Sequence, residues 1–234
     1  MTSRNWVKFF FTTLLIGATT TGIVGMVVRW NEFESLYSGF NFVGMLLIFL
    51  WLFGVGLIFS LLSQMGFFAY LTIHRFGLGM FRSVTLWNIA QIVIIVLTIV
   101  DLVYLRYSRF AEKGDSILPY IGVALLVLIV GLAVAYFKAK QTNKNAFIPA
   151  LFFMVVITVI EWVPVLRINK HTWFYIMLIA LLACNAYQLL TLHKVNEKSA
   201  QQREKITSKQ SAHSVQQSKK KSGQKKKKKK AKPS

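Results

Sequence analysis

The stretch FNFVGMLLIFLWLFGVGLIFSLLSQMGFFAYLTI, residues 40–73, carries no charged side chain and decides the fold of the chain. As one helix it would extend about 50 Å at 1.5 Å per residue, whereas the hydrocarbon core of a bilayer is about 30 Å thick. We therefore expect it to divide into a membrane span at about 42–62 and an interfacial helical segment at 63–79. Gly66, Gly77 and Gly79 are expected to supply the bends.

Five further apolar runs have the length of a membrane span, at about 9–28, 84–105, 117–137, 147–166 and 173–192. About 20 apolar residues are needed for a helix to cross hydrocarbon, and the helix satisfies its own backbone hydrogen bonds there. The run at 9–28 is expected to be an uncleaved first span. The sequence therefore predicts an all-α integral membrane protein, a bundle of about six transmembrane helices.

The charge of the chain is concentrated at its C-terminal end. The 234 residues include 28 Lys and Arg against 8 Asp and Glu, and more than half of the basic residues follow position 193. The segment 194–234 is rich in Lys, Gln and Ser and ends near a run of six lysines. Such a composition has too few apolar residues to offset the entropy of ordering. We therefore expect two parts, a polytopic transmembrane domain at 1–193 and a disordered Lys-rich tail at 194–234.

Orientation follows from the Lys and Arg residues near the span ends. Without the tail these residues divide almost equally between the two sides, and the tail decides the orientation. We expect a multi-pass protein of the bacterial cell membrane with both termini cytoplasmic.

Two carboxylates lie inside predicted spans, and three arginines lie near the same predicted outer ends. The acids are Asp101 and Glu161, and the arginines are Arg29, Arg106 and Arg167. An ionisable group within a span is costly and is a functional candidate by default. We interpret these residues as a structural ion-pair cluster, with a ligand or sensing site and proton coupling as the alternatives.

A second polar set consists of uncharged amides, which in spans commonly form interhelical hydrogen bonds; its members are Gln64, Asn88, Gln91, Asn185 and Gln188. Small residues at spacing four, Gly17, Thr21 and Gly25, predict close helix packing in the first span. Packing within the bundle is the favoured interpretation of this spacing, and a homo-oligomeric contact is the alternative.

Motifs of enzymes, metal sites and cofactor sites are missing from the sequence. The four histidines are scattered, the lone Cys184 lies in an apolar run, and no Gly-rich phosphate loop or nucleophile motif occurs. We therefore predict no catalytic, cofactor or metal-ligating residues.

The Lys-rich tail has three interpretations. Attraction to anionic lipid headgroups at the cytoplasmic surface adds about 1 kcal/mol per basic residue, and this is the interpretation we favour. Binding to nucleic acid by counterion release is a second interpretation, although we do not expect nucleic acid to be the partner of the tail. A topological retention signal without a partner is the third.

Several strings resemble one protein family. These are SRNWVKFF at Ser3–Phe10, SQMGFFAYLTIHRFGLG at Ser63–Gly79, LWN at Leu86–Asn88 and DLVYLRY at Asp101–Tyr107. Together they make the chain similar, over about residues 1–195, to the KinB-signalling-pathway activation (KbaA) family of endospore-forming bacteria. The resemblance implies a non-enzymatic membrane activator of a sensor histidine kinase pathway that starts sporulation.

The interfacial segment is the predicted contact surface for such a membrane partner. Its long, aromatic and surface-lying character suits contact with the membrane-proximal helices of a kinase, and the candidate residues are Gln64, Phe67, Tyr70, His74 and Arg75. The alternative function, from a different class, is a small ion-coupled transporter or permease that uses Asp101 and Glu161.

Overall fold

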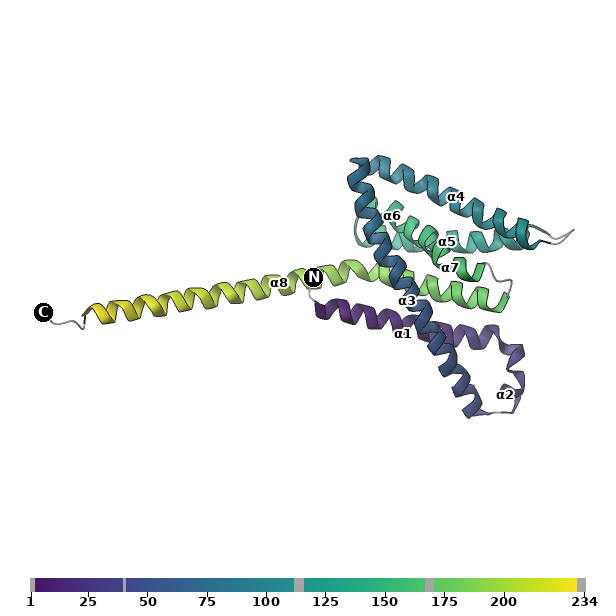
Figure 1. Ribbon diagram of the computed structural model, residues 1–234, viewed down its shortest axis with the longest axis horizontal. Coiled ribbons are helices and arrows are strands. Elements are labelled where there is room, and N and C mark those ends of the chain that lie inside the picture. Colours follow the sequence, from purple (N-terminus) through teal and green to yellow (C-terminus); the bar gives the residue numbers. More distant parts are fainter. Residues whose placement is uncertain (1–2, 40, 112–115, 167–170, 231–234) are drawn as a thin grey trace. The chain divides into compact units, whose positions relative to one another are not determined.

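The computed structural model describes the backbone of residues 3–39, 41–111, 116–166 and 171–230, and side chains through Glu204 apart from residues 3, 35, 36 and 171. Its described residues form helices joined by short turns (Figure 1). In chain order the helices are α1 (Ser3–Val28), η1 (Trp30–Glu32), α2 (Glu34–Ser38), α3 (Phe42–Phe81), α4 (Val84–Phe110), α5 (Leu118–Gln141), η2 (Lys144–Ala146), α6 (Phe147–Phe152), η3 (Phe153–Ile157), α7 (Thr158–Leu166) and α8 (His171–Lys230).

Six stretches of helix among the described residues are long and apolar enough to cross a membrane. They are Arg4–Val28, Phe42–Phe81, Val84–Phe110, Leu118–Gln141, Lys144–Leu166 and Thr172–Glu204. The prediction of an all-helical chain with six long apolar helices is therefore confirmed.

The predicted division of residues 40–73 is wrong. Helix α3 is one helix of 40 residues, so no interfacial segment separates from it after position 62. Asn41 begins the helix by accepting a hydrogen bond from the Gly44 amide at 2.9 Å, and Arg82 ends it in the left-handed conformation at φ 50°. A division of this stretch is needed only if the helix has to stay within one bilayer thickness. Interhelical packing along α3 instead favours a continuous helix.

Two of the three glycines expected to bend α3 serve close approach instead, whereas a Cβ added at the third, Gly79, would meet nothing within 4 Å. A Cβ added at Gly66 would overlap the carboxyl of Glu161, and one added at Gly77 would lie 2.5 Å from the Trp87 ring. Both glycines lie within the helix. They therefore let α7 and α4 pack closely against α3.

Helix α1 packs its small residues against α3. A Cβ added at Gly17 would lie 2.6 Å from Ser60 Cβ and 2.8 Å from Cys184 Sγ. Thr21 is buried, and a Cβ added at Gly56 would lie 2.7 Å from it. The interpretation of this spacing as packing within the bundle is therefore confirmed.

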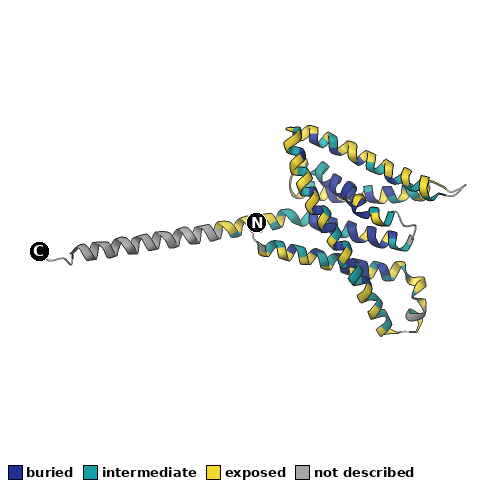
Figure 2. Ribbon diagram, in the orientation of Figure 1, coloured by how far each residue is buried: buried dark blue, intermediate teal, exposed yellow. Residues whose placement is uncertain are grey.

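The most buried part of the helical bundle is the run α6–η3–α7 together with the beginning of α8, residues 172–192 (Figure 2). Residues 150–159 are all buried. Helix α5 packs against α6 and η3, and α3 packs against α4, η3 and α7. The core therefore forms around the fifth and sixth apolar stretches, while α4 and α5 keep many large apolar side chains exposed.

The chain divides into two compact units, residues 9–192 and a smaller unit of residues 1–8 with 193–234. In the smaller unit, Asn5 Nδ2 donates to Ser199 Oγ at 3.1 Å and to Gln202 Oε1 at 3.2 Å. The backbone of α8 is helical through Lys230, whereas its composition predicts disorder. Lys and Gln have good helix propensity. The disorder of residues 194–234 stays a prediction.

The contact between α1 and α3 predicts the effect of a larger side chain at Gly56. Gly56→Leu should lower the free energy of unfolding by about 2 kcal/mol or more, because overpacking forces two backbones apart. Gly54→Leu is the matched control, since no atom lies within 4 Å of a Cβ added there. Thermal unfolding of the detergent-solubilised variants measures the difference. Equal melting temperatures for the two variants would contradict the close packing.

Candidate functional site

Polar side chains from three helices meet in the interior of the larger unit. Ser63 on α3 donates to Asn185 Oδ1 at 2.6 Å, and Gln188 Nε2 donates to Ser63 Oγ at 2.7 Å. Asn185 Nδ2 donates to Thr158 Oγ1 at 2.9 Å and to Glu161 Oε2 at 2.8 Å. All five side chains are buried. We call this set, Ser63, Thr158, Glu161, Asn185 and Gln188, the buried polar network.

Asn185 on α8 is the centre of the network. Its amide oxygen accepts from α3 and its amide nitrogen donates twice to α7. Interhelical hydrogen bonds of this kind fix the rotation and depth of helices that otherwise pack through apolar surfaces. The network therefore sets the register among α3, α7 and α8.

Glu161 is the ionisable member of the network, with 4% of its surface exposed. Its Oε2 accepts from Asn185, whereas Oε1 has no hydrogen-bond partner among the described residues. Oε1 lies against Gly66, where any side chain would collide with it. An unsatisfied buried polar atom is costly, so Glu161 is a candidate for a functional rather than a purely structural role.

The helix that carries Glu161 is irregular on both sides of it. The preceding turn, η3, is a π-helix over Phe153–Ile157, and Pro164 lies inside α7. Proline removes one backbone hydrogen bond within a helix, and single π-helical turns occur frequently at functional sites. Glu161 thus lies on a short helical piece with weakened backbone bonding at each end.

The predicted amide set is only partly joined by hydrogen bonds. Asn185 and Gln188 form interhelical bonds, as predicted. Gln91 is fully buried, but neither of its amide atoms has a partner among the described residues, and the same holds for Gln64 Nε2 and Asn88 Oδ1.

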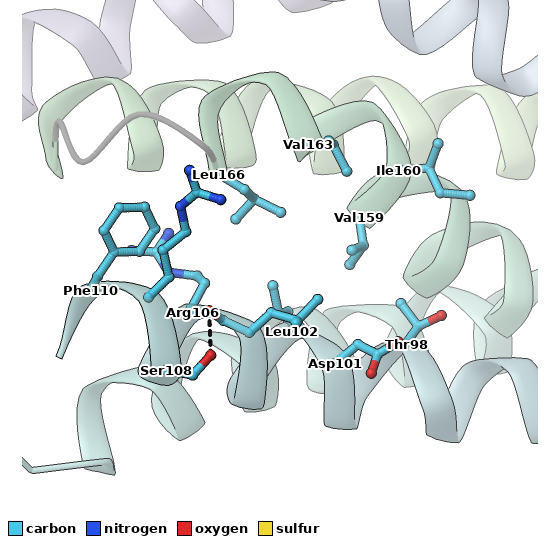
Figure 3. Close-up of a pocket in the computed structure, with 12 residues that line it drawn as sticks. Thr98, Asp101, Leu102, Arg106, Ser108, Phe110, Val159, Ile160, Val163 and Leu166 are labelled. Carbon is cyan, nitrogen blue, oxygen red and sulfur yellow. Dashed lines mark hydrogen bonds between the residues drawn. The ribbon is translucent and has the colours of Figure 1, made fainter.

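The predicted ion-pair cluster is not brought together among the described residues. Arg29 Nε donates to Glu32 at 2.9 Å. Arg106 and Asp101 line one pocket between α4 and α7, at opposite ends, and Arg106 also stacks on Phe174 (Figure 3). Glu161 belongs to the buried polar network, and Arg167 lies outside the described residues. A role for any of these residues stays a proposal.

The expected surface position of the candidate contact residues is wrong for three of them. Gln64 and Phe67 are buried, and so is Tyr70, whose hydroxyl donates to the Pro149 carbonyl at 2.9 Å. These residues form the inward face of a continuous α3, so neighbouring helices cover them. His74 is half-buried and its Nδ1 accepts from Trp87 Nε1 at 3.1 Å, whereas Arg75 is exposed.

Comparison with known proteins identifies the family. The model of the family described as "KbaA: KinB-signalling pathway activation in sporulation" matches residues 17–195. The chain belongs to the KbaA family. It is also 46% identical over 194 residues to the KinB-signaling pathway activation protein of Bacillus subtilis (strain 168), an alignment that spans 83% of this chain and 98% of that protein. No solved structure matches the chain.

The KbaA family match includes every member of the buried polar network, and two of those members escaped sequence reasoning as site residues. Thr158 and Ser63 are single hydroxyl residues in apolar runs, and a single hydroxyl residue in such a run has no distinguishing pattern. The spacing of Glu161 three residues after Thr158, on one helix face, is the signal that could have joined them.

A second interaction missed by sequence reasoning involves Lys138 on α5. Its side chain is buried, and Nζ donates to the Leu189 carbonyl on α8 at 2.7 Å. From the sequence alone, Lys138 is one of the positive charges near the end of a predicted span. Long lysine side chains near helix ends can reach polar groups at some distance, and this one joins α5 to α8.

The buried polar network predicts a large effect of removing its central amide. Asn185→Ala should lower the free energy of unfolding by about 2 kcal/mol, because it removes the acceptor of the Ser63 hydroxyl and the donor to Thr158 Oγ1 and Glu161 Oε2. Asn88→Ala is the control, since Asn88 Oδ1 accepts no hydrogen bond from any residue that the structure describes. Thermal or denaturant unfolding in detergent compares the two variants. If Asn88→Ala lowered the free energy of unfolding as much as Asn185→Ala, the result would contradict the network.

Proposed function

We propose that this protein is a non-enzymatic membrane activator of a KinB-type sensor histidine kinase pathway in sporulation. The observation that carries the proposal is the family match over residues 17–195, which covers nearly all of the compact unit 9–192. The described relative aligns over 98% of its own length, so the likeness includes the whole helical bundle rather than one motif.

The proposed location in a cell membrane is supported by the distribution of apolar side chains. Large exposed hydrophobic residues occur along α3, α4 and α5, among them Phe42, Leu47, Ile58, Val93 and Leu125. Exposed apolar surface costs about 25 cal/mol per Å² in water. A lipid environment removes that cost.

The proposed contact surface for a kinase is the exposed face of the C-terminal half of α3. Phe76 is 75% exposed, Met80 is 73% exposed, and Phe68 and Arg75 are exposed beside them. The predicted contact residues Gln64, Phe67 and Tyr70 would then support this face from inside. An exposed aromatic and basic helix face suits the membrane-proximal helices of a partner.

A transporter that uses Asp101 and Glu161 is the alternative function. The observation in its favour is Glu161 Oε1, which is buried without a hydrogen-bond partner among the described residues. Asp101 is exposed in the pocket between α4 and α7, whereas Glu161 is buried beside α3 and α8. Their different positions argue against the two carboxylates binding one ion together. Solute-dependent proton flux in vesicles containing the purified protein would favour the transporter.

Restoration of sporulation signalling tests the activator. In a spore-forming host that lacks its resident family member, this protein should restore a kinase-dependent reporter and should fail to do so when the sensor kinase is also deleted. Restoration without the kinase, or no restoration at normal membrane abundance, would contradict the proposal.

The same assay tests the contact surface. Arg75→Ala combined with Phe76→Ala should reduce reporter output several-fold at unchanged abundance, because both side chains are exposed. Phe67→Ala is the matched comparison and should lower abundance as well, since truncating a buried phenylalanine costs about 3–5 kcal/mol. Full signalling from the Arg75 and Phe76 double variant would remove this face from consideration.

The proposed orientation has both termini cytoplasmic, with the Lys-rich tail near anionic headgroups. In a Cys184→Ala background, an impermeant thiol reagent added to intact cells should label Ser38→Cys and leave Ser83→Cys and Asn143→Cys protected. Mass shift after labelling measures the outcome. Labelling of Ser83→Cys in intact cells would contradict the proposed orientation.

A further inference from the structure

A pocket of about 730 Å³ opens between α4 and α7, apart from the buried polar network (Figure 3). Its apolar wall comes from both helices and consists of Leu102, Leu105, Val159, Ile160, Val163 and Leu166. Its polar groups come from α4 and include Arg106, Arg109 and Asp101. We infer that this pocket binds an anionic phospholipid, with the phosphate at Arg106 and Arg109 and an acyl chain along the apolar wall.

The positive charge of Arg106 is held in place by aromatic rings, and no carboxylate of the described residues neutralises it. Its guanidinium lies 3.9 Å from the centre of the Phe174 ring, 5.6 Å from that of Phe110 and 6.0 Å from that of Tyr120. Aromatic faces attract a cation and fix its position, but they carry no net charge. Arg106 has no carboxylate within salt-bridge distance among the described residues, and its Nη1 is buried without a hydrogen-bond partner.

Arg109 adds a second guanidinium to the same end of the pocket. It follows Arg106 by three residues on α4, so the two side chains leave neighbouring turns on one face. Guanidinium groups present several donors in a planar fork that matches phosphate oxygens. Two of them at the mouth of one pocket therefore favour a phosphate over a neutral headgroup.

Asp101 orients the ligand. Figure 3 shows Arg106 beside Phe110 and Leu166 at one end of the pocket, and Asp101 beside Thr98 at the other. Arg106 follows Asp101 by five positions, which corresponds to about 7.5 Å along the helix axis. Because the carboxylate repels a phosphate, the headgroup belongs at the arginine end.

The apolar wall favours a lipid over a free phosphate. Val159, Val163 and Leu166 face the pocket from α7, and a phosphate alone would leave their surfaces against water. Ile160 and Leu105, each 58% exposed, lie at its edge. An acyl chain entering from the surrounding lipid would cover these side chains. The inference shares the membrane location with the proposed function and is independent of kinase activation.

Lipid binding to the purified full-length protein in neutral detergent tests the inference by native mass spectrometry. Phosphatidylglycerol should bind at least about tenfold more tightly than phosphatidylcholine with the same acyl chains, since charge-assisted hydrogen bonds are the stronger kind. Glycerol 3-phosphate should bind more weakly than phosphatidylglycerol, because it lacks the acyl chains. Equal binding of the two lipids, or of the headgroup alone and phosphatidylglycerol, would overturn the inference.

Two variants assign the binding to this pocket. Arg106→Gln should weaken phosphatidylglycerol binding about tenfold, whereas Arg75→Gln, which removes the same charge from an exposed site on α3, should leave it unchanged. Because both variants keep the Lys-rich tail, its attraction for anionic lipid cancels in the comparison. Equal effects of Arg106→Gln and Arg75→Gln would contradict the site.

Val163→Phe gives a test that keeps every charge. The larger side chain should fill the apolar part of the pocket and weaken phosphatidylglycerol binding several-fold, with an unchanged melting temperature and elution volume. Unweakened binding by a folded Val163→Phe protein would overturn the inference even if Arg106→Gln failed to fold. Reporter output is no part of this measurement, so failure here leaves the proposed signalling function untouched.

Discussion

The side-chain amide of Asn185 joins three helices in the apolar interior. Its oxygen accepts from Ser63 on α3, and its nitrogen donates to Thr158 and Glu161 on α7. Apolar helix faces can slide or rotate past each other at little cost, whereas an amide with fixed donors and acceptors allows one arrangement. The positions of the other helices that pack on α3, α7 and α8 follow from that arrangement.

This hydrogen bonding requires backbones that approach closely, and small residues make that approach possible. Gly66 leaves room for the Glu161 carboxyl, and Gly17 leaves room for Ser60 and Cys184. The same close approach lets Ser60 Oγ donate to the Thr13 carbonyl at 2.8 Å. The interhelical hydrogen bonds and the small-residue contacts thus both depend on close packing of neighbouring helices against α3.

The sequence predicted the six long apolar helices because length and apolar composition are local properties. The packing of Gly17, Thr21 and Gly25 was also predictable, since their spacing defines one helix face. The continuity of α3 was not, because the aromatic and basic residues after position 62 have the composition of an interfacial segment. Phe67 and Tyr70 differ from an exposed aromatic pair only in what packs over them, here Phe153 and Pro149.

Only some members of the candidate site could be predicted from the sequence, because their hydrogen-bond partners depend on how the helices pack. Glu161, Asn185 and Gln188 stand out as polar residues in apolar runs, but their partners depend on the rotation of each helix. The expected pairing of Glu161 with arginines at the helix ends assumed that opposite charges meet. Its bond to Asn185 arises because α7 turns this carboxyl toward α8 and α3, which places it among neutral amides and hydroxyls.

The π-helical turn η3 has a consequence for how the gene sequence can change. A residue added to or removed from an α-helix turns everything beyond it by about 100°, since one turn takes 3.6 residues. The wide turn at Phe153–Ile157 accommodates one residue more than an α-helical turn would. Deleting a single codon in that turn would therefore let it close as an ordinary α-helical turn and keep Glu161 directed toward Asn185. Deleting a codon from the α-helical residues between η3 and Glu161 would instead turn Glu161 away from Asn185, while Tyr70 kept its bond to Pro149.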